Sequence, residues 1–218
     1  MVSLPKYYNT SINNETIAIC IPVRDHVTAA FSYSLAMLMK KCGETGLKTT
    51  VHMVIGSEIA SQRQQLVTAA LLTDCTHILW LDSDMKFPSD ILQKLLSNDH
   101  DIIACNYSTR VAPYLPVAFK SDIDMDMRLT REETGIQSVC AVGLGCMLVK
   151  REVYIRIPLP HFGVEWNDDY SSLIGEDLYF CRKARKHDYT ILIDCDLSNQ
   201  ISHIGTAAFN MEGTLLND

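Results

Sequence analysis

Two aspartates one residue apart at the end of an apolar run are the most informative feature of this chain. Residues 77–90 read HILWLDSDMKFPSD, so Asp82 and Asp84 directly follow the apolar segment 78–81. A buried strand would deliver both carboxylates to its C-terminal end, where open α/β sheets bind ligands. Two hard oxygen donors suit Mg²⁺ or Mn²⁺, and a divalent cation suits a diphosphate. The simpler alternative is a strand that ends in a polar turn.

A second pair of acids opens the segment 175–194, which reads GEDLYFCRKARKHDYTILID. Glu176 and Asp177 fall in the first turn of an expected helix. Acids in a first turn favour the helix dipole, and this is a complete structural explanation. In the functional alternative, one of them reaches a cleft and accepts a proton from a hydroxyl nucleophile.

Charged residues also follow the first expected strand, where Arg24 and Asp25 come directly after Pro22 and Val23. This places them at the same sheet edge as the paired aspartates. Arg24 can contact phosphate and Asp25 can accept hydrogen bonds from a base or ribose, unless the two form a surface ion pair. Arg63 lies in the next expected helix, where an arginine directed toward the helix N-terminus can bind a diphosphate bidentately. A solvated helix face is the alternative for Arg63.

The C-terminal half adds a histidine, two aromatic residues and a glycine. His203 lies in a loop beyond the last strand, where it can complete a carboxylate metal site. Phe162 and Trp166 belong to the segment HFGVEWNDDY, and aromatic rings beside carboxylates can form a platform for a sugar. A satellite hydrophobic cluster is the alternative. Gly145 permits close approach of a ligand or of another strand.

Strands and helices are expected to alternate up to residue 108. Apolar runs predict strands at 16–23, 48–55, 77–81 and 101–107, with helices at 27–41, 58–73 and 89–97 between them. Thr28 is the candidate N-cap of the first helix, and Gly43 lies near its expected end. This order implies a parallel sheet with right-handed crossovers.

The pattern changes after residue 108. Short antiparallel strands are expected around 116–120 and 137–150, followed by a helix at 175–188 and a last strand at 190–194. No linker rich in Pro, Gly or Ser divides the chain. We therefore expect a single domain, 1–218, with two unlike halves.

Composition limits the possible partners and location. Among 218 residues, 47% are hydrophobic, and the net charge of −7 argues against nucleic-acid binding by bulk electrostatics. No apolar run approaches the ~18 residues of a membrane span, and the N-terminus lacks the apolar region of a signal peptide. The eight cysteines form no C-x-x-C pair and lie mostly in apolar runs, which favours buried thiols in a cytosolic protein. We expect a cytoplasmic protein, in the host cytoplasm if the chain is viral.

Taken in order, these segments resemble the glycosyltransferases of GT-A fold. The resemblance rests on IPVRD, LWLDSDM followed by FP, GLGCMLV, GEDLYF and the late His-Ile-Gly, and it covers roughly residues 16–205. The spacing is most similar to that of the compact enzymes of phages and large DNA viruses, such as a chlorovirus capsid-glycan glycosyltransferase domain. The Gln-x-x-Arg-Trp signature of processive synthases is absent, so polymer synthesis is not expected.

The resemblance implies an α/β fold of GT-A type, with a mostly parallel central sheet flanked by helices and a smaller antiparallel C-terminal part. About 16–108 would be the nucleotide-binding half and about 109–205 the acceptor side. The implied activity is metal-dependent transfer of a sugar from a nucleotide-sugar donor to a hydroxyl of a glycan or glycoprotein. Mn²⁺ or Mg²⁺ is the expected cofactor, and UDP is the expected nucleotide.

The resemblance also assigns roles to residues. Asp84 would bind the metal directly, Asp82 would contact metal or ribose, and His203 would be the third metal ligand. Asp177, or else Glu176, is the candidate base. The expected donor contacts are Pro22, Val23, Arg24, Asp25, Arg63, Asp82 and Ser83, and the expected acceptor contacts are Phe162, Trp166 and Gly145.

Two other function classes fit parts of the sequence. A nucleotidyltransferase acting on sugar phosphates shares the sheet, the paired acids and the metal. It usually carries a Gly-rich basic loop after its first strand, and IPVRDHV has no glycine. A non-catalytic domain that binds a glycan or nucleotide would keep the aromatic residues, but it does not need both the Asp82/Asp84 pair and Asp177.

Overall fold

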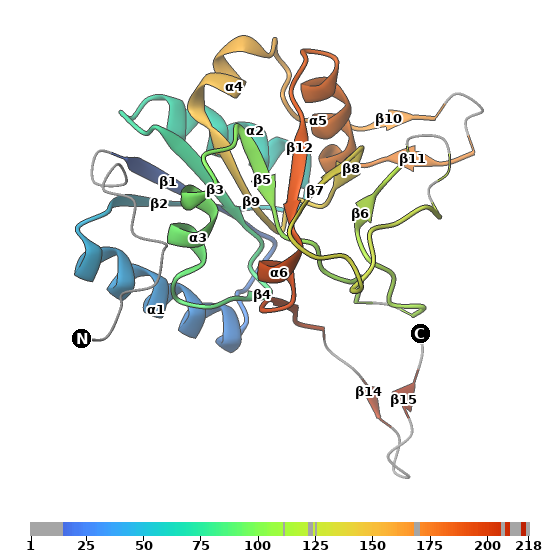
Figure 1. Cartoon of the computed structure of the whole chain (residues 1–218), viewed down its shortest axis with the longest axis horizontal. Coiled ribbons are helices and arrows are strands. Elements are labelled where there is room, and N and C mark those ends of the chain that lie inside the picture. The colour runs from blue at the N-terminus through green and yellow to red at the C-terminus, as the bar shows by residue number, and fades with distance from the viewer. Residues whose placement is uncertain are drawn as a thin grey trace.

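A seven-stranded sheet runs through the centre of the protein, in the order β2-β1-β3-β9-β5-β12-β7 (Figure 1). The computed structural model describes residues 15–110, 112–121, 124, 126–167, 171–205, 208–209 and 215–216. The strands of the sheet are β1 Thr16–Val23, β2 Lys48–Ile55, β3 His77–Leu81, β5 Ile102–Ala104, β7 Ile136–Val139, β9 Cys146–Lys150 and β12 Ile191–Asp194.

Most strands of this sheet run in one direction. β1 pairs in parallel with β2 and with β3, and β12 pairs in parallel with β5. β9 is antiparallel to both β3 and β5, and β7 is antiparallel to β12. Only β9 and β7 therefore oppose the others within the sheet, which confirms the mostly parallel α/β architecture.

Helices cover both faces of the sheet. α1 (Ala29–Thr45) and α3 (Ile91–Ser97) pack on one face, and α2 (Ile59–Leu71), α4 (Arg151–Arg156) and α5 (Glu176–Arg185) pack on the other. The short helix α6 (Cys195–Ser198) follows β12. Along β1, isoleucines face α1 while Ala18 and Cys20 face α2. Because both faces are covered, this strand is apolar throughout its interior positions.

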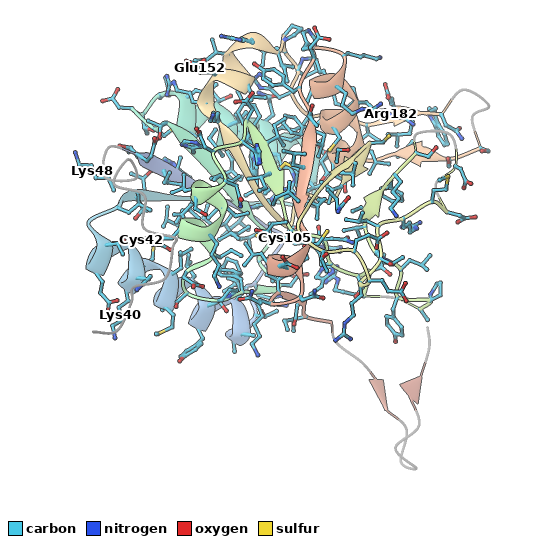
Figure 2. All side chains as sticks on the ribbon, in the orientation of Figure 1. Lys40, Cys42, Lys48, Cys105, Glu152 and Arg182 are labelled. Atoms are coloured by element: carbon cyan, nitrogen blue, oxygen red, sulfur yellow. The ribbon has the colours of Figure 1, made fainter. Side chains whose placement is uncertain are left out.

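Side chains fill the space between these layers. Cys105 lies in the middle of the molecule, whereas Lys40, Lys48 and Arg182 lie at its periphery (Figure 2). Seven of the eight cysteines are buried, as expected from their apolar neighbours. Among the helices that the structure describes, none combines the length and apolar character that a membrane crossing requires.

Short antiparallel pairs surround the main sheet, mostly after residue 108 as expected. They are β4 (Met85–Lys86) with β13 (Ser202–His203), β6 (Ala118–Phe119) with β8 (Ala141–Val142), β10 (Glu165–Trp166) with β11 (Leu173–Ile174), and β14 (Ala208–Phe209) with β15 (Leu215–Leu216). The β4–β13 pair matters most for function. It sets His203 opposite Met85 and so brings the C-terminal histidine next to Asp84.

Helix α1 has the expected N-cap but ends later than expected. It begins after Thr28, whose hydroxyl oxygen accepts a hydrogen bond from the Phe31 amide at 3.1 Å. The helix does not end near Gly43 but continues to Thr45, and Gly46 terminates it with a φ of 72°. That left-handed conformation suits a residue without Cβ.

The segment 137–150 is not one strand, as the sequence suggested, but three: β7, β8 and β9. β9 is not an edge strand of the sheet. It inserts between β3 and β5 in the middle of the sheet, where Cys146, Met147, Leu148 and Val149 are all buried. The expected strand at 101–107 is correspondingly short, since β5 ends at Ala104. Helix α5 ends at Arg185, three residues before its expected end, and the remaining bounds in the central sheet and its helices agree within about two residues, which is the usual uncertainty at the end of an element.

Candidate active site

A cavity of about 300 Å³ opens at the carboxyl ends of β1, β2 and β3. In open α/β sheets this edge is the usual place for a ligand. Nine residues that the sequence suggested line the cavity: Pro22, Arg24, Arg63, Asp82, Ser83, Asp84, Glu176, Asp177 and His203. They come from distant segments of the chain, and the cavity therefore unites the two acidic motifs with the late histidine.

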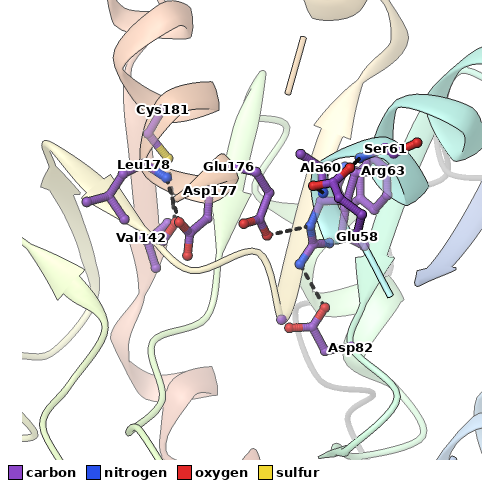
Figure 3. Close-up of polar contacts among 12 residues, drawn as sticks. Glu58, Ala60, Ser61, Arg63, Asp82, Val142, Glu176, Asp177, Leu178 and Cys181 are labelled. Carbon is purple, nitrogen blue, oxygen red and sulfur yellow. Dashed lines mark hydrogen bonds and ion pairs between the residues drawn. The ribbon is translucent and has the colours of Figure 1, made fainter. Parts of the chain in front are cut away.

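Arg63 is the central ion-pairing residue of this cavity. Its side chain is only 3% exposed; Nη2 donates to Asp82 Oδ1 at 2.8 Å and Nε donates to Glu176 Oε1 at 3.1 Å (Figure 3). The guanidinium also lies over the Trp80 ring, 5.4 Å from its centroid. Burial alone would lower the pKa of Arg63, but the two carboxylates outweigh it and raise the pKa above its usual value. Arg63 thus ties helix α2 to the ends of β3 and α5.

One nitrogen of Arg63 is left without a partner. Nη1 is buried and makes no hydrogen bond to any residue that the structure describes. Leaving a buried donor unpaired costs about 1–3 kcal/mol.

Asp84 and His203 form a second polar group in the same cavity. His203 Nδ1 lies 2.9 Å from the carbonyl oxygen of Ser108, so this nitrogen donates and Nε2 faces Asp84 Oδ1 at 3.3 Å. Burial acts against both charges, but their mutual hydrogen bond dominates, lowering the pKa of Asp84 and raising the pKa of His203. The other carboxylate oxygen of Asp84 accepts a hydrogen bond from Arg110 Nη1 at 2.6 Å.

These groups meet the requirements of a divalent cation in part. A carboxylate and an imidazole oriented by a backbone carbonyl are suitable ligands for Mn²⁺. Asp82 lines the same cavity, and its Oδ1 accepts a hydrogen bond from Arg63. Within the described residues, no three His, Cys, Asp or Glu side chains are grouped closely enough to hold a metal. Asp84 and His203 therefore fit a cation that takes its remaining ligands from a bound diphosphate.

Asp177 differs from the acid beside it. Glu176 is bound by Arg63, whereas Asp177 Oδ1 accepts a hydrogen bond from the Leu178 amide at 2.7 Å. Burial, followed by repulsion from Glu176, raises the pKa of Asp177 to about 6. Although Asp177 lies in the first turn of α5, its carboxyl group holds a proton more tightly than that of an ordinary aspartate.

Two of the suggested donor contacts do not line the cavity. The Val23 side chain is 2% exposed, and its carbonyl oxygen accepts hydrogen bonds from Gln62 Nε2 at 2.6 Å and from the Gly56 amide at 2.9 Å. Asp25 is an exposed residue whose Oδ1 lies 2.5 Å from His26 Nδ1. Val23 therefore serves to join β1 to α2, and Asp25 forms a surface pair.

The two aromatic residues suggested as acceptor contacts differ in their exposure. Phe162 is 4% exposed and packs its ring 5.3 Å from Trp80 and 5.4 Å from Phe180, so it belongs to the core and not to an acceptor floor. Trp166 is 56% exposed on β10 and remains available to a ligand.

Gly145 accommodates a side chain of the protein itself. A Cβ atom at this position would lie 2.6 Å from the Tyr107 hydroxyl, and the Gly145 amide donates to that hydroxyl at 2.9 Å. Its carbonyl oxygen accepts a hydrogen bond from the Asp82 amide at 3.1 Å. Both backbone polar groups are therefore engaged within the protein, and the small residue makes room for Tyr107 instead of an acceptor.

Seven residues that line the cavity were not suggested by the sequence, and two of these have ionisable side chains, Tyr107 and Arg110. Both follow β5, whose carboxyl end meets the same edge of the sheet as that of β3. The sequence feature that could have suggested Arg110 is its position, because it comes after a buried strand, as Arg24 does.

Comparisons with known proteins agree with this fold. The family model named Anp1 matches residues 48–115, and no curated protein matches the chain. The crystal structure of A197 from STIV has a TM-score of 0.55 and 18% identity, covering 93% of this chain and 94% of its own. A Drosophila beta-1,4-galactosyltransferase 7 variant in complex with manganese, UDP-Gal and xylobiose has a TM-score of 0.51 and 14% identity, covering 91% of this chain and 78% of its own.

A glycosyltransferase involved in glycosylation of the major capsid of PBCV-1 is also found, at a TM-score of 0.37 and 13% identity, covering 66% of this chain and 69% of its own. The Anp1 match contains Arg63, Asp82 and Asp84, and the A197 and galactosyltransferase likenesses extend over nearly the whole chain. The identities are low, so these two structures establish a shared architecture. The chain has the GT-A fold of the nucleotide-sugar glycosyltransferases.

Proposed function

We propose that the protein is a glycosyltransferase that moves a sugar from a nucleotide-sugar donor to a hydroxyl group of a glycan or glycoprotein acceptor. The observation that carries this proposal is the composition of one cavity. The Asp84–His203 pair, the buried Arg63 and the carboxyl group of Asp177 all line it at the ligand-binding edge of the sheet. A domain that only binds a glycan has no use for this combination.

The donor would be held by the arginines and by the loops after β1 and β3. The Arg24 guanidinium supplies hydrogen-bond donors to phosphate or sugar oxygens, the buried Arg63 supplies positive charge, and Pro22 and Ser83 supply part of the wall. UDP is the proposed nucleotide. The complex of the galactosyltransferase neighbour with manganese and UDP-Gal supports this choice.

Asp84 and His203 would hold a divalent cation, Mn²⁺ or Mg²⁺. When bound there, the cation would neutralise charge on the diphosphate leaving group. The residues of this chain have the remaining tasks. Ser108 orients the His203 ring through Nδ1, and Arg63 holds the Asp82 and Glu176 side chains in place.

Asp177 is the proposed general base. As the acceptor oxygen bonds to the anomeric carbon and the bond from that carbon to the phosphate oxygen breaks, Asp177 takes the hydroxyl proton. A carboxyl group with a pKa of about 6 is a better proton acceptor than an ordinary aspartate and is still ionised at pH 7. Glu176 is less suited because Arg63 already binds it. This role applies to transfer with inversion of the anomeric centre.

The exposed ring of Trp166 is the proposed platform for the acceptor. It lies on β10, and the β10–β11 hairpin leads directly into the helix that begins with Glu176 and Asp177. Sugar C–H faces stack on such rings, and an exposed tryptophan is otherwise unfavourable for a soluble surface.

A donor-hydrolysis assay tests the proposal. Purified protein is incubated with UDP-, GDP- and dTDP-sugars in Mn²⁺, with and without a chelator, and release of the nucleoside diphosphate is measured. We expect release from a UDP-sugar, loss of that release with the chelator, and little release by Asp84→Asn. Absence of both hydrolysis and binding for every nucleotide sugar would contradict the proposal.

A further inference from the structure

Arg110 makes the shortest contact to the proposed metal ligand Asp84, although no motif pointed to it. Its Nη1 lies 2.6 Å from Asp84 Oδ2, while His203 Nε2 lies 3.3 Å from Oδ1. Both oxygens of the carboxylate are thus engaged before any ligand is present. A cation that approaches Asp84 must compete with a guanidinium that already neutralises it.

Exposure distinguishes Arg110 from Arg63. The Arg110 side chain is 50% exposed, whereas that of Arg63 is 3% exposed. The Asp84 side chain is 18% exposed, but water screens the half-exposed guanidinium, and the long side chain loses conformational freedom when it is held, so the net stability from this ion pair is small. Arg63 is therefore fixed, and Arg110 can leave Asp84 at small cost.

The loop that carries Arg110 also sets His203 in place. Ser108, two residues earlier, accepts the Nδ1 hydrogen bond of His203, and the stem of Arg110 lies near Gly205, two residues after His203. The amide of Ile204 donates to the Asp84 carbonyl oxygen at 2.8 Å. The backbone segments that carry Asp84, His203 and Arg110 thus lie against one another, and the Arg110 guanidinium remains the movable part.

We propose that Arg110 is a displaceable cation that occupies Asp84 in the donor-free protein and passes to the diphosphate when donor and metal bind together. The diphosphate offers pairs of oxygens that an arginine can bind bidentately, and these new hydrogen bonds compensate for the departure of Arg110 from Asp84. Arg110 would thereby make metal binding weak without donor and strong with it. This inference rests on the proposed function, since it requires a metal and a diphosphate in this cavity.

The test is a measurement of Mn²⁺ affinity by electron paramagnetic resonance of free Mn²⁺, with and without UDP. Wild type is compared with Arg110→Ala and with Arg24→Ala. The second variant is a matched control, because it removes the same charge from the same cavity without touching Asp84. In the absence of UDP, Arg110→Ala should bind Mn²⁺ about fivefold more tightly than wild type, which corresponds to about 1 kcal/mol. Arg24→Ala should change this affinity by less than about twofold, as expected for loss of a screened, more distant charge.

The same titrations measure coupling between the two ligands. UDP should strengthen Mn²⁺ binding in wild type, and this enhancement should be several-fold smaller in Arg110→Ala. Coupling is reciprocal, so the effect of Mn²⁺ on UDP binding must fall by the same factor.

Three results would overturn the inference. If Arg110→Ala and Arg24→Ala bind Mn²⁺ equally, with wild-type coupling, then Arg110 does not compete for Asp84, and the proposed function stands. If wild type binds UDP equally with Mn²⁺ and with chelator, then the guanidinium stays on Asp84 and replaces the metal. If no variant binds UDP under any condition, the inference and the proposed function fail together.

Discussion

At the scale of single residues, the neighbours Glu176 and Asp177 show how position within one helical turn separates two carboxylates. Glu176 is bound by the buried Arg63, and Asp177 is buried without that partner, which raises the pKa of Asp177 to about 6. The sequence suggested both as candidates and favoured Asp177. It could not predict the direction of the pKa shift, because the shift depends on burial that distant segments create.

The first prediction concerns the chemistry of Asp177. Asp177→Asn keeps the side-chain shape and the acceptor for the Leu178 amide, but it removes the proton acceptor. The transfer rate should fall roughly 10²–10⁴-fold, as is typical for loss of a general base. The affinities for donor and metal should change little. Steady-state kinetics together with calorimetric titration of UDP and Mn²⁺ check this. A variant that transfers within a few-fold of wild type would move the role to Glu176 or indicate a retaining mechanism.

The pH dependence of the reaction follows from the ionisation of Asp177. Because the base must be ionised, the wild-type transfer rate should rise with pH through about 6, the pKa of Asp177, and level off above it. The measurement is kcat/KM between about pH 5 and pH 8, on either side of that pKa. A rate that is flat across this interval would show that ionisation of Asp177 does not control the reaction.

The second prediction is that Asp177→Asn stabilises the protein. The pKa of Asp177 rises from 3.8 to about 6 on folding, so the native state holds the proton more tightly than the unfolded chain. The free energy of unfolding therefore falls as the pH rises from 3.8 to about 6, and it is level above that pH. Asp177→Asn should raise that free energy by about 3 kcal/mol at pH 7.5, and by about half as much at pH 5. Urea unfolding at both pH values checks the size and the sign. An equal gain at both values would exclude ionisation as the cause.

At the scale of secondary-structure elements, Arg63 joins three of them. It belongs to α2, and it pairs with Asp82 after β3 and with Glu176 at the start of α5. The sequence suggested Arg63 as a phosphate contact. It could not show that two of its nitrogens are occupied by carboxylates located 19 and 113 residues away along the chain.

The third prediction tests this junction. Arg63→Met keeps much of the side-chain volume but leaves Asp82 and Glu176 without their cation. The free energy of unfolding should fall by about 3–5 kcal/mol, the usual cost of removing one partner from a buried pair. Arg63→Lys is the matched control; it keeps the charge but cannot reproduce the forked contact, so its loss should be smaller. If denaturant unfolding places Arg63→Met within about 0.5 kcal/mol of wild type, the junction is not a major source of stability.

The strands of the sheet show where sequence patterns succeed and where they fail. The bounds of β1, β2 and β3 could be predicted because each is an apolar run of strand length between turn residues. The insertion of β9 between β3 and β5 could not, because a buried apolar strand has the same pattern whether it runs parallel or antiparallel. The contact between Gly145 and Tyr107 could not be predicted either, because the two residues are remote in sequence.

The fourth prediction compares two glycines. Gly145→Ala would place Cβ 2.6 Å from the Tyr107 hydroxyl, whereas Gly43→Ala, inside α1, would meet nothing within 4 Å. Gly145→Ala should lower the free energy of unfolding by about 1–3 kcal/mol, as overpacking does. Gly43→Ala should raise it by about 0.5–1 kcal/mol through helix propensity. Chemical denaturation of both variants checks the opposite signs, and a stabilised Gly145→Ala would refute the close packing of Tyr107.

At the scale of the whole molecule, the fold brings charges from distant parts of the chain to one edge of the sheet. The cavity is lined by four carboxylates, Asp82, Asp84, Glu176 and Asp177, and by three arginines, Arg24, Arg63 and Arg110. The charges thus nearly balance locally, although the chain as a whole carries −7. A cavity with paired charges of both signs suits a ligand that is itself a cation–diphosphate pair, and this is the central claim.

Calorimetric titration of UDP in the presence of Mn²⁺ tests that claim most directly, with wild type, Asp84→Asn and Asp90→Asn compared. Asp90 is a suitable control, because it is an exposed carboxylate that pairs with Lys94 and does not line the cavity. Wild type and Asp90→Asn should bind UDP equally, and binding should weaken strongly when a chelator replaces Mn²⁺. Asp84→Asn should bind at least about tenfold more weakly, a loss of about 1.4 kcal/mol or more, with an unchanged circular dichroism spectrum. Equal UDP affinity of Asp84→Asn and wild type in Mn²⁺ would contradict the assignment of this cavity as a metal-dependent nucleotide-sugar site.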